Sequence, residues 1–271
     1  MITKKDIIKE FWEAHPLCAY EIPYQPGTVD FFKEHDRLKL ENTEKFNMHI
    51  WELDYHKGDL VLDVGCGPGW LVQEYSQRGA EIVGVDLTWQ AISLTKQRLN
   101  YQVLKGALVQ ADAESLPFRE NTFDFISCSG VLRHTPNTLA GIHEIHRILK
   151  PGHKAVISLY YRSFIFNPII WSVSKRLIYR LYLKTGFRNQ VKYAKYPDDF
   201  IKLYDGDGNP LGKAYTFKQV KELFSCFSSV KFEIHYFPRR FLEPFIKINN
   251  TIILKLLDKF MGTMLFGVAT K

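Results

Sequence analysis

The chain has 271 residues, of which 46% are hydrophobic and 24% are charged, and its formal net charge is +7. These values are typical of globular proteins and exclude a disordered or fibrous chain, while the length allows one large domain with additional cap elements. No apolar run approaches the roughly 18–20 residues of a membrane-spanning helix, and acidic residues interrupt the apolar positions near the start, so we expect a cytoplasmic protein with neither a membrane span nor a signal peptide.

Residues 1–50 precede the regular part of the sequence and are expected to form an N-terminal helical cap. From residue 51 to residue 161, strand patterns alternate with helix patterns, which is typical of a parallel sheet covered by helices on both faces. Thr88 predicts the start of one helix, and Thr135-Pro136 predicts the start of another that ends at Lys150. The predicted strands of this core span residues 60–65, 81–87, 107–113, 122–130 and 153–161.

Residues 162–215 interrupt this alternation and are expected to form a basic, aromatic cap insertion over a substrate. Within this insertion, residues 164–186 mix apolar and basic positions and predict a basic amphipathic helix. Residues 216–271 return to the core with a helix capped by Thr216. Two further strands are predicted at residues 230–237 and 263–271. We therefore expect a single domain overall, in which the cap segments decide the substrate.

The positive charge is concentrated in the C-terminal part of the chain. Residues 1–161 contain 17 Lys and Arg against 21 Asp and Glu, whereas residues 162–271 contain 19 against 8. A basic half indicates contact with an anionic membrane face, an acidic carrier or nucleic acid, and solubility alone is the alternative. The four cysteines show no CxxC pair and no histidine at ligand spacing, so neither a zinc site nor a disulfide framework is expected.

A glycine-rich loop follows the first predicted strand. The sequence VLDVGCGPGW, residues 61–70, places Gly65, Gly67 and Gly69 between that strand and a helix. Glycines there allow a tight turn and a close approach of the backbone to a ligand, while the helix N-terminus offers unpaired N–H groups. The loop therefore predicts a site for a nucleotide-like ligand. A dinucleotide-binding loop would need a third glycine where this chain has Trp70, which disfavours NAD.

Acidic residues follow the next two predicted strands. Asp86 ends the second strand, where a carboxylate can accept hydrogen bonds from a ribose and the neighbouring Leu87 can pack on a base. Asp112 ends the third strand, where its carboxylate can accept a hydrogen bond from adenine beside the backbone N–H of Ala113. Because the carboxyl ends of parallel strands share one edge of a sheet, we expect these residues to line one crevice with the glycine loop.

Five blocks of sequence occur in a characteristic order over about residues 45–161. They are VLDVGCGPG, VGVDL, ADAESLPF, FDFISCSGVLRHTPN and HEIHRILKPG. In these blocks the chain resembles the class I S-adenosylmethionine-dependent methyltransferases of the ubiquinone/menaquinone C-methyltransferase type. The resemblance implies an α/β, doubly wound (Rossmann-like) fold with a seven-stranded sheet, its last strand antiparallel, plus helical cap segments. It also implies S-adenosylmethionine as the cofactor and S-adenosylhomocysteine as the product.

The resemblance further implies which residues bind the cofactor. The methionine part would contact Asp63 and the glycine loop, and the ribose would contact Asp86. The adenine would contact Asp112 and Ala113, and the cofactor's amino group would donate to the backbone around Cys128 and Ser129. For each residue, the alternative is a structural role in a tight turn or a helix cap.

Methyl transfer requires the protein to hold an acceptor in line with an activated methyl group and to exclude water. If the acceptor must lose a proton, histidine titrates nearest to neutrality, and His134 after the fourth strand is the candidate general base. Stabilising the next helix is the alternative role for His134, and His15 and His35 compete with it. The candidate substrate residues in the N-terminal cap are Tyr20, Tyr24 and Phe32, whose aromatic faces attract a sulfonium cation, and Arg37, which can pair with a carboxylate.

Together these observations predict an enzyme that methylates an apolar small molecule, such as a quinone, lipid, polyketide or other secondary metabolite, on oxygen, carbon or nitrogen. The acceptor is expected free or carrier-bound, with a peripheral contact to a membrane or an acidic carrier. Two alternatives stay open: an RNA methyltransferase and a non-catalytic protein that binds the cofactor. Nucleic acid is the less favoured partner, because the Asn/Asp-Pro-Pro-Tyr/Phe motif of adenine N-methylating enzymes is missing after the fourth strand. The chemistry calls for no metal.

Overall fold

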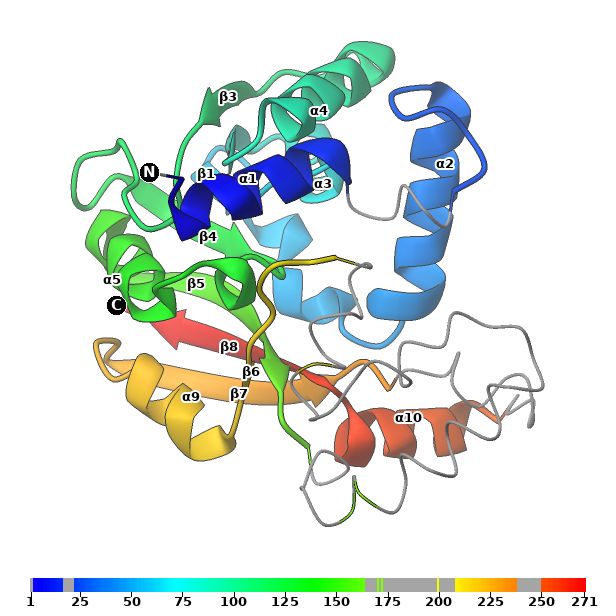
Figure 1. Cartoon of the computed structure of the whole chain (residues 1–271). Helices are drawn as coiled ribbons and strands as arrows, with labels where there is room; N and C mark the ends of the chain where they lie inside the picture. Colours follow the sequence, from blue (N-terminus) through cyan, green and yellow to red (C-terminus); the bar gives the residue numbers. More distant parts are fainter. Residues whose placement is uncertain are drawn as a thin grey trace.

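Figure 1 shows the computed structural model of the chain, which describes residues 2–16, 22–163, 208–237 and 250–271, together with three single positions, Ile170, Ser172 and Asp199. Most of the predicted basic cap, residues 162–215, therefore lies outside the described residues, as do the amphipathic helix expected over 164–186 and the side chain of Tyr20. None of the helices in the described part of the chain combines the length and the apolarity that crossing a bilayer requires.

The strands form one sheet in the order β3-β2-β1-β4-β5-β8-β7. Neighbouring strands from β3 to β5 pair in parallel, whereas β8 runs antiparallel to both of its neighbours, β5 and β7. This is the doubly wound sheet with an antiparallel last strand that the sequence predicts. The seven strands are β1 (Leu60–Val64), β2 (Glu81–Asp86), β3 (Ala107–Gln110), β4 (Phe123–Cys128), β5 (Leu149–Tyr161), β7 (Ser229–His235) and β8 (Met264–Thr270). An additional strand, β6 (Ala214–Tyr215), pairs with the end of β5 and is too short for any periodicity to predict.

Helices cover both faces of the sheet. Successive residues of a buried strand point to opposite faces, so neighbouring residues of β1 pack against different helices. Val61 of β1 packs in a cluster with Trp51 and with α3 (Trp70–Gln77) and α4 (Trp89–Gln102). Leu62 packs in a second cluster with α5 (Thr138–Ile148) and α9 (Phe217–Leu223). Both Val61 and Leu62 are completely buried. The core therefore consists of two apolar layers with the sheet between them.

Several helix ends follow from local capping chemistry that the sequence predicts. Thr88 caps α4 by accepting a hydrogen bond from the backbone N–H of Ala91. Thr216 forms a capping box with Gln219 at the start of α9, which satisfies two backbone donors at once. The last helix, α10 (Thr251–Met261), packs against β7 and is followed by Gly262.

Several predicted boundaries are wrong by a few residues; the third strand, for example, ends at Gln110 and not at residue 113. α5 begins after Asn137 and not at Thr135-Pro136, because the Asn137 side chain accepts a hydrogen bond from the backbone N–H of Ala140 and so caps the helix. The same helix ends at Ile148, and β5 begins at Leu149 and not at residue 153, since Leu149 already pairs with Phe123 of β4.

The region before β1 is largely helical, as expected for the N-terminal segment. It contains α1 (Lys4–Ala14), α2 (Val29–Leu38), the π-helix η1 (Lys39–Thr43) and the 3₁₀ helices η2 (Met48–Trp51) and η3 (Leu53–Tyr55). α1 and α2 both contact α4, and in Figure 1 α1 (dark blue) crosses the upper part of the molecule near α4. The division of the chain into cap segments and a core stays a prediction.

Candidate cofactor-binding site

The glycine loop after β1 adopts a backbone that other residues rarely take. Gly65, Gly67 and Gly69 have φ angles of +71°, +52° and +80°. A Cβ atom on Gly65 would lie 2.1 Å from Cγ2 of Val131, so a side chain at this position would need both a strained backbone and more space. On Gly67, in contrast, a Cβ atom would meet no heavy atom of the described residues within 4 Å. The loop is thus packed against the protein at Gly65 and open at Gly67.

Asp86, at the end of β2, is bonded directly to this loop. Its Oδ2 atom accepts a hydrogen bond from the backbone N–H of Gly67 at 3.1 Å, and its Oδ1 atom accepts from the N–H and the hydroxyl of Thr88 at 2.9 Å and 2.8 Å. Burial raises the pKa of the Asp86 carboxyl, although these three hydrogen bonds oppose the shift. The next residue, Leu87, is half-buried, and its carbonyl accepts from the side chain of Gln110 at 3.0 Å.

Asp63 lies one residue before the end of β1 and is only 3% exposed. Its Oδ1 atom accepts a hydrogen bond from the hydroxyl of Ser127 on β4 at 2.7 Å, because the two residues are paired in the register of the sheet. Burial raises the pKa of Asp63 to about 7, against the effects of the Ser127 hydroxyl and of the Lys39 charge. The strand that leads into the glycine loop therefore carries, two residues before Gly65, a carboxyl group with a pKa near neutral pH.

Asp112, after β3, has a partner that the sequence analysis missed. Lys5 of α1 forms ion pairs with Asp112 and with Glu114, the latter at 2.8 Å. The other oxygen of Asp112 accepts from the backbone N–H of Glu114 at 2.9 Å, and Ala113 between them is buried. The carboxylate predicted to accept from adenine is thus partly engaged by α1.

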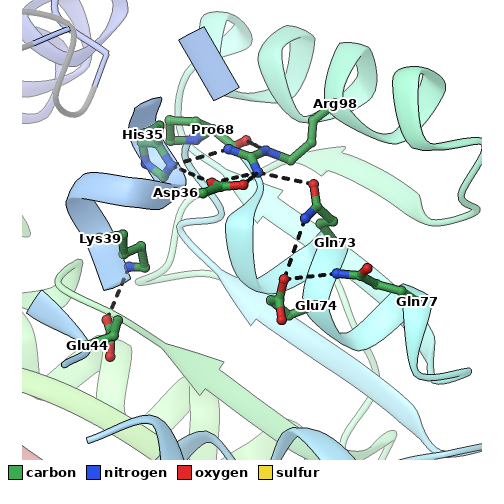
Figure 2. Close-up of polar contacts among 9 residues, drawn as sticks. All are labelled: His35, Asp36, Lys39, Glu44, Pro68, Gln73, Glu74, Gln77 and Arg98. Atoms are coloured by element: carbon green, nitrogen blue, oxygen red, sulfur yellow. Dashed lines mark hydrogen bonds and ion pairs between the residues drawn. The ribbon is translucent and has the colours of Figure 1, made fainter. Parts of the chain in front are cut away.

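A buried arginine fixes the outer side of the glycine loop, as Figure 2 shows. Arg98 of α4 is 1% exposed, and its Nε donates to the carbonyl oxygen of Pro68 at 2.6 Å. Its Nη1 donates to both carboxylate oxygens of Asp36 on α2, at 2.8 Å and 2.9 Å, and to Gln73 of α3 at 3.1 Å. The same guanidinium lies 3.2 Å from Nδ1 of His35, whose pKa is lowered to about 4 by burial and by the neighbouring positive charges. One side chain therefore joins the loop to three helices.

His134 lies in the 3₁₀ helix η4 (Leu132–His134) that follows β4, and it is 6% exposed. Its Nδ1 atom is 2.6 Å from the carbonyl oxygen of Leu211 and therefore donates to it, while its Nε2 atom accepts from Nε of Arg133 at 3.0 Å. The ring also forms an edge contact with Trp12 of α1, at 5.0 Å between centroids. Tyr160 of β5 lies 6.4 Å away on another side. An aromatic cluster thus borders the end of β4.

The other predicted cofactor residues on β4 lie at the same edge of the sheet. Cys128 is completely buried at the end of the strand, and burial raises the pKa of its thiol well above the ordinary value. Ser129 follows it and is half-buried. Beyond them Gly130, with a φ of +75°, donates its backbone N–H to the hydroxyl of Ser158 at 2.8 Å. The backbone at Cys128 and Ser129 is therefore held in a turn between β4 and η4.

Two of the predicted substrate residues of the N-terminal segment, Phe32 and Arg37, contact other side chains of the protein. Phe32 of α2 is buried against α4, where the Arg98 guanidinium lies 4.6 Å from its ring centroid and Tyr101 lies 6.1 Å away. Arg37 forms ion pairs with Glu34 and Glu41 on the surface of its own helical segment. Tyr24 is 47% exposed, and Tyr20 lies outside the described residues. Their role in substrate binding stays a prediction, and Phe32 and Arg37 already have protein partners.

Three residues of the site were not singled out from the sequence: Lys5, Trp12 and Arg98. A signal existed for Arg98, because it falls on the buried stripe of its predicted helix next to Thr95 and Leu99, where an arginine requires a partner. For Lys5 and Trp12 the only signal was the amphipathic pattern of the first helix, which does not say what the helix covers.

The arrangement fits a ligand of the nucleotide type. Three successive parallel strands end in a glycine loop, a carboxylate bonded to that loop and a second carboxylate, which is where doubly wound sheets bind nucleotide cofactors. The open side of the loop at Gly67, the buried carboxyl group of Asp63 and the carboxylates of Asp86 and Asp112 supply the hydrogen-bonding groups for such a ligand. The fold and the site thus define a Rossmann-like cofactor-binding protein.

Comparisons with known proteins narrow this class. Residues 62–157 match the methyltransferase domain family. Over 134 residues the chain is 32% identical to the demethylmenaquinone methyltransferases of Staphylococcus aureus strains JH9 and Newman. This alignment covers 46% of this chain and 54% of each relative. The chain therefore matches only about half the length of these curated relatives. The glycine loop and the parallel strands of the sheet described above therefore fall largely in a stretch of the chain that is similar to a methyltransferase domain.

Solved structures agree on the fold. The magnesium protoporphyrin IX methyltransferase of Synechocystis PCC 6803, solved with bound SAH, superposes with a TM-score of 0.60 at 15% identity, covering 98% of this chain and all of that one. A putative methyltransferase from Bacillus halodurans gives a TM-score of 0.52 at 14% identity over 84% of this chain and 99% of that one. At such identities the likeness shows the fold alone.

Proposed function

We propose that the whole chain is an S-adenosylmethionine-dependent methyltransferase whose acceptor is an apolar small molecule, of the quinone, lipid or polyketide kind. The observation that carries this proposal is the hydrogen bond from the Gly67 backbone to Asp86, because it joins the glycine loop to the carboxylate expected at the ribose. When bound, the cofactor supplies a methyl group that is already activated, so the protein needs no covalent intermediate.

In the proposed reaction the residues of this chain hold the cofactor, exclude water and hold the acceptor. Asp63, the glycine loop and Asp86 hold the cofactor, with Asp112, Ala113 and the backbone of Cys128 and Ser129 completing its site. α1 covers the carboxyl edge of the sheet through Lys5 and through Glu13, whose carboxylate accepts from the backbone N–H groups of Trp89 and Gln90 at 2.9 Å and 2.8 Å. A covered edge excludes water and holds an acceptor close to the methyl group.

The acceptor class is supported by two observations. The curated relatives named above are demethylmenaquinone methyltransferases, whose name implies a quinone-type acceptor. In this chain, the aromatic rings of Trp12, His134 and Tyr160 lie next to one another at the end of β4 and β5. Residues 162–195 add eight Lys and Arg with no Asp or Glu, which favours an anionic membrane or carrier beside the acceptor.

His134 remains our candidate general base, and the geometry sets a condition on that role. Donation from Nδ1 to Leu211 fixes the tautomer in which Nε2 carries the lone pair, as a base requires. Because Arg133 donates to this same nitrogen, its guanidinium must move before Nε2 can take a proton. If His134 is the base, His134→Gln should lower kcat at least a hundredfold while cofactor affinity stays constant. An unchanged kcat would leave His134 with a structural role.

The first experiment is calorimetric titration of the chain with S-adenosylmethionine, S-adenosylhomocysteine and NAD. We expect micromolar binding of the first two and none of NAD, with at least a tenfold loss in Asp86→Asn, because an amide cannot accept from Gly67, Thr88 and a ribose as a carboxylate does. Asp124→Asn is the matched control, since Asp124 accepts from Leu60 and Lys150 at the start of β4, on the opposite edge of the sheet. Binding of NAD alone would refute the proposal.

The acceptor is then sought by transfer of a radiolabelled methyl group to apolar quinones, phenols and lipids, with total RNA as a parallel acceptor. Labelling of an apolar acceptor supports the proposal. Labelling of RNA alone, with an affinity that falls steeply with salt, would replace it by the RNA alternative. Flotation with anionic liposomes tests the membrane contact separately, and a chain that binds cofactor but methylates none of these acceptors would be a binding protein.

A further inference from the structure

One face of β7 carries polar side chains that the proposed reaction does not use. Residues that are two apart in a strand point to the same face, so Lys231, Glu233 and His235 lie in a row, while Phe232 faces Phe217 and Phe224 on the other side. Nε2 of His235 is 3.2 Å from Oε2 of Glu233. Lys231 is bonded to the other carboxylate oxygen, Oε1, at 2.7 Å. Glu233 thus presents Oε2 next to an imidazole nitrogen.

A second histidine reaches the same oxygen from a distant part of the sequence. His49 lies in η2, the short helix that also places Trp51 against Phe266 of β8. Its Nε2 atom is 3.0 Å from Oε2 of Glu233. The donor atoms of His49, Glu233 and His235 all lie within 4.8 Å of one another. Two imidazole nitrogens and one carboxylate oxygen therefore converge on one point between η2 and β7.

We infer that His49, Glu233 and His235 form a site for a divalent transition-metal ion, with Zn²⁺ as the best-fitting ion. Zn²⁺ takes imidazole nitrogen and carboxylate oxygen at about 2.0–2.2 Å in a tetrahedron, which sets neighbouring ligand atoms roughly 3.3–3.6 Å apart. The two observed N···O separations, 3.0 Å and 3.2 Å, need to widen by a few tenths of an ångström, and the two imidazole nitrogens, which lie within 4.8 Å of each other, need to adopt the same spacing. His49 is 61% exposed at its side chain, so solvent can supply the fourth ligand.

The surroundings of His235 favour the tautomer that a metal ligand needs. Its Nδ1 atom donates to Oδ2 of Asp258 on α10 at 2.8 Å, so the proton that a metal ion would displace is the one on Nε2, which forms a hydrogen bond to Glu233 in the metal-free chain. Asp258 is itself held, because its other oxygen accepts from the backbone N–H of Phe237 at 2.8 Å. A carboxylate behind a ligating histidine is the usual outer-shell partner in zinc sites. Asp258 is thus a positioning residue, and Lys231 keeps Glu233 monodentate.

The site is distinct from the cofactor crevice, because β4, β5 and β8 lie between β1 and β7 in the sheet. A metal ion there would tie η2, which leads into β1, to the far edge of the sheet. The inference therefore does not depend on the proposed reaction. No ligand-spacing motif could have predicted this site, because His49 and His235 are 186 positions apart.

The test is calorimetric titration of the untagged, chelator-treated chain with Zn²⁺, together with the visible spectrum of its Co²⁺ complex. We expect one equivalent of Zn²⁺, a tetrahedral Co²⁺ spectrum and a higher Tm in the presence of Zn²⁺. His49→Gln should weaken binding at least tenfold, and because His49 is exposed this variant should fold like the parent. His143→Gln, which removes an exposed histidine of α5, is the matched control and should bind like the parent.

Asp258→Asn tests the positioning role with two readouts. The amide can still accept from Phe237, but its NH₂ group would face Nδ1 of His235 and favour the tautomer that cannot ligate through Nε2. Zn²⁺ affinity should fall ten- to a hundredfold, while binding of S-adenosylhomocysteine stays unchanged. Absence of stoichiometric Zn²⁺ binding in the parent, or equal affinity in parent and His49→Gln, would overturn the inference.

Discussion

Two carboxylates proposed to bind the cofactor, Asp63 and Asp86, differ in how well the folded chain solvates their charge. Asp63 is buried within the sheet, and among the described residues only the hydroxyl of Ser127 donates to its carboxylate. Asp86 is only partly buried and receives three hydrogen bonds, two of them from backbone N–H groups. A buried carboxyl group with one donor is poorly solvated when charged. Asp63 is therefore the residue at which we expect stability to have been given up for binding.

The burial of the Asp63 carboxylate should make the stability of the folded chain depend on pH, and Asp63→Asn should remove this dependence. The pKa of Asp63 is about 7 in the folded chain and 3.8 when exposed, so the folded state binds more protons between these values and its stability falls as the pH rises. The amide keeps the acceptor for Ser127 without a charge. As the pH rises from about 4 to about 8, we expect the free energy of unfolding of the variant to increase relative to that of the parent by up to about 4 kcal/mol. Urea unfolding at several pH values measures this.

The control for this experiment is Asp124→Asn, whose expected pH dependence has the opposite sign. Burial tends to raise the pKa of Asp124, but hydrogen bonds from Lys150 and Leu60 lower it overall. The stability that Asp124 contributes is therefore present above the unfolded pKa and is lost as the pH falls through the folded pKa. An Asp63→Asn variant whose relative stability does not change with pH would contradict a raised pKa at Asp63.

The two ends of the glycine loop should respond differently to an added methyl group. Gly65→Ala meets both a positive φ and the side chain of Val131, so we expect it to lower the free energy of unfolding by more than about 2 kcal/mol. Gly67→Ala meets only the backbone strain, roughly 1 kcal/mol, but its Cβ points into the open side of the loop. It should weaken S-adenosylhomocysteine binding at least tenfold. Thermal unfolding measures the stability of both variants, and calorimetry measures their affinity for S-adenosylhomocysteine. A larger loss of stability in Gly67→Ala than in Gly65→Ala would contradict this expectation.

At the scale of elements, α2 and the glycine loop are held together mainly through α4. Arg98 supplies this connection in Figure 2, where its guanidinium points between Pro68, Asp36 and Gln73. α1, in contrast, is attached by ion pairs of partly exposed side chains, such as Lys5 with Asp112 and Glu114, by the hydrogen bonds that Glu13 accepts from the start of α4, and by aromatic edge contacts. Exposed ion pairs contribute little. α2 should therefore be the more firmly attached helix.

Arg98→Met tests the connection made by α4. The change keeps an apolar stem but leaves Asp36 and the Pro68 carbonyl without their donor, so we expect the free energy of unfolding to fall by roughly 3 kcal/mol. Cofactor affinity should fall as well, because the loop loses its outer support. Arg78→Met is the matched control, since the Arg78 side chain is 33% exposed and that of its partner Asp54 is 84% exposed, and it should cost under about 1 kcal/mol. Equal losses in the two variants would show that the Arg98 network adds nothing.

The elements that sequence could predict are those fixed by local chemistry. Thr88 and Thr216 mark helix starts by capping, and the three glycines mark the loop by their conformation. The connections between elements could not be predicted, because each joins residues far apart in the sequence. Lys5 and Asp112 are 107 positions apart, and Arg98 and Asp36 are 62 apart. Such pairs depend on how the helices dock, which periodicity does not encode.

At the scale of the whole molecule, stability should be graded from the middle of the sheet outward. β1, β4 and β5 are covered on both faces, and their central residues are completely buried. α1 has two buried apolar residues, Ile8 and Phe11, in eleven. Few buried contacts allow local opening at low free energy. The molecule thus combines a rigid sheet with a helix that can open over the cofactor edge.

Hydrogen exchange followed by mass spectrometry tests this gradient. Amides of β1, β4 and β5 should exchange slowest, and those of α1 should exchange at least a hundredfold faster, because α1 opens without unfolding the sheet. Addition of S-adenosylhomocysteine should slow exchange in α1 and in the loops after β1 and β2, whereas NAD should not. Exchange of α1 as slow as that of β4 would contradict a helix that opens independently.

The strand order also constrains how the chain folds during synthesis. Among the described strands β7 pairs only with β8, which follows it in the sequence yet lies between it and β5. When β7 emerges from the ribosome it therefore has no partner, and at about 5–20 residues per second the wait for β8 lasts on the order of seconds. Until then the far side of β5 also stays open to non-native pairing. Efficient folding of this protein in cells should thus depend on chaperones that protect the nascent chain during that interval.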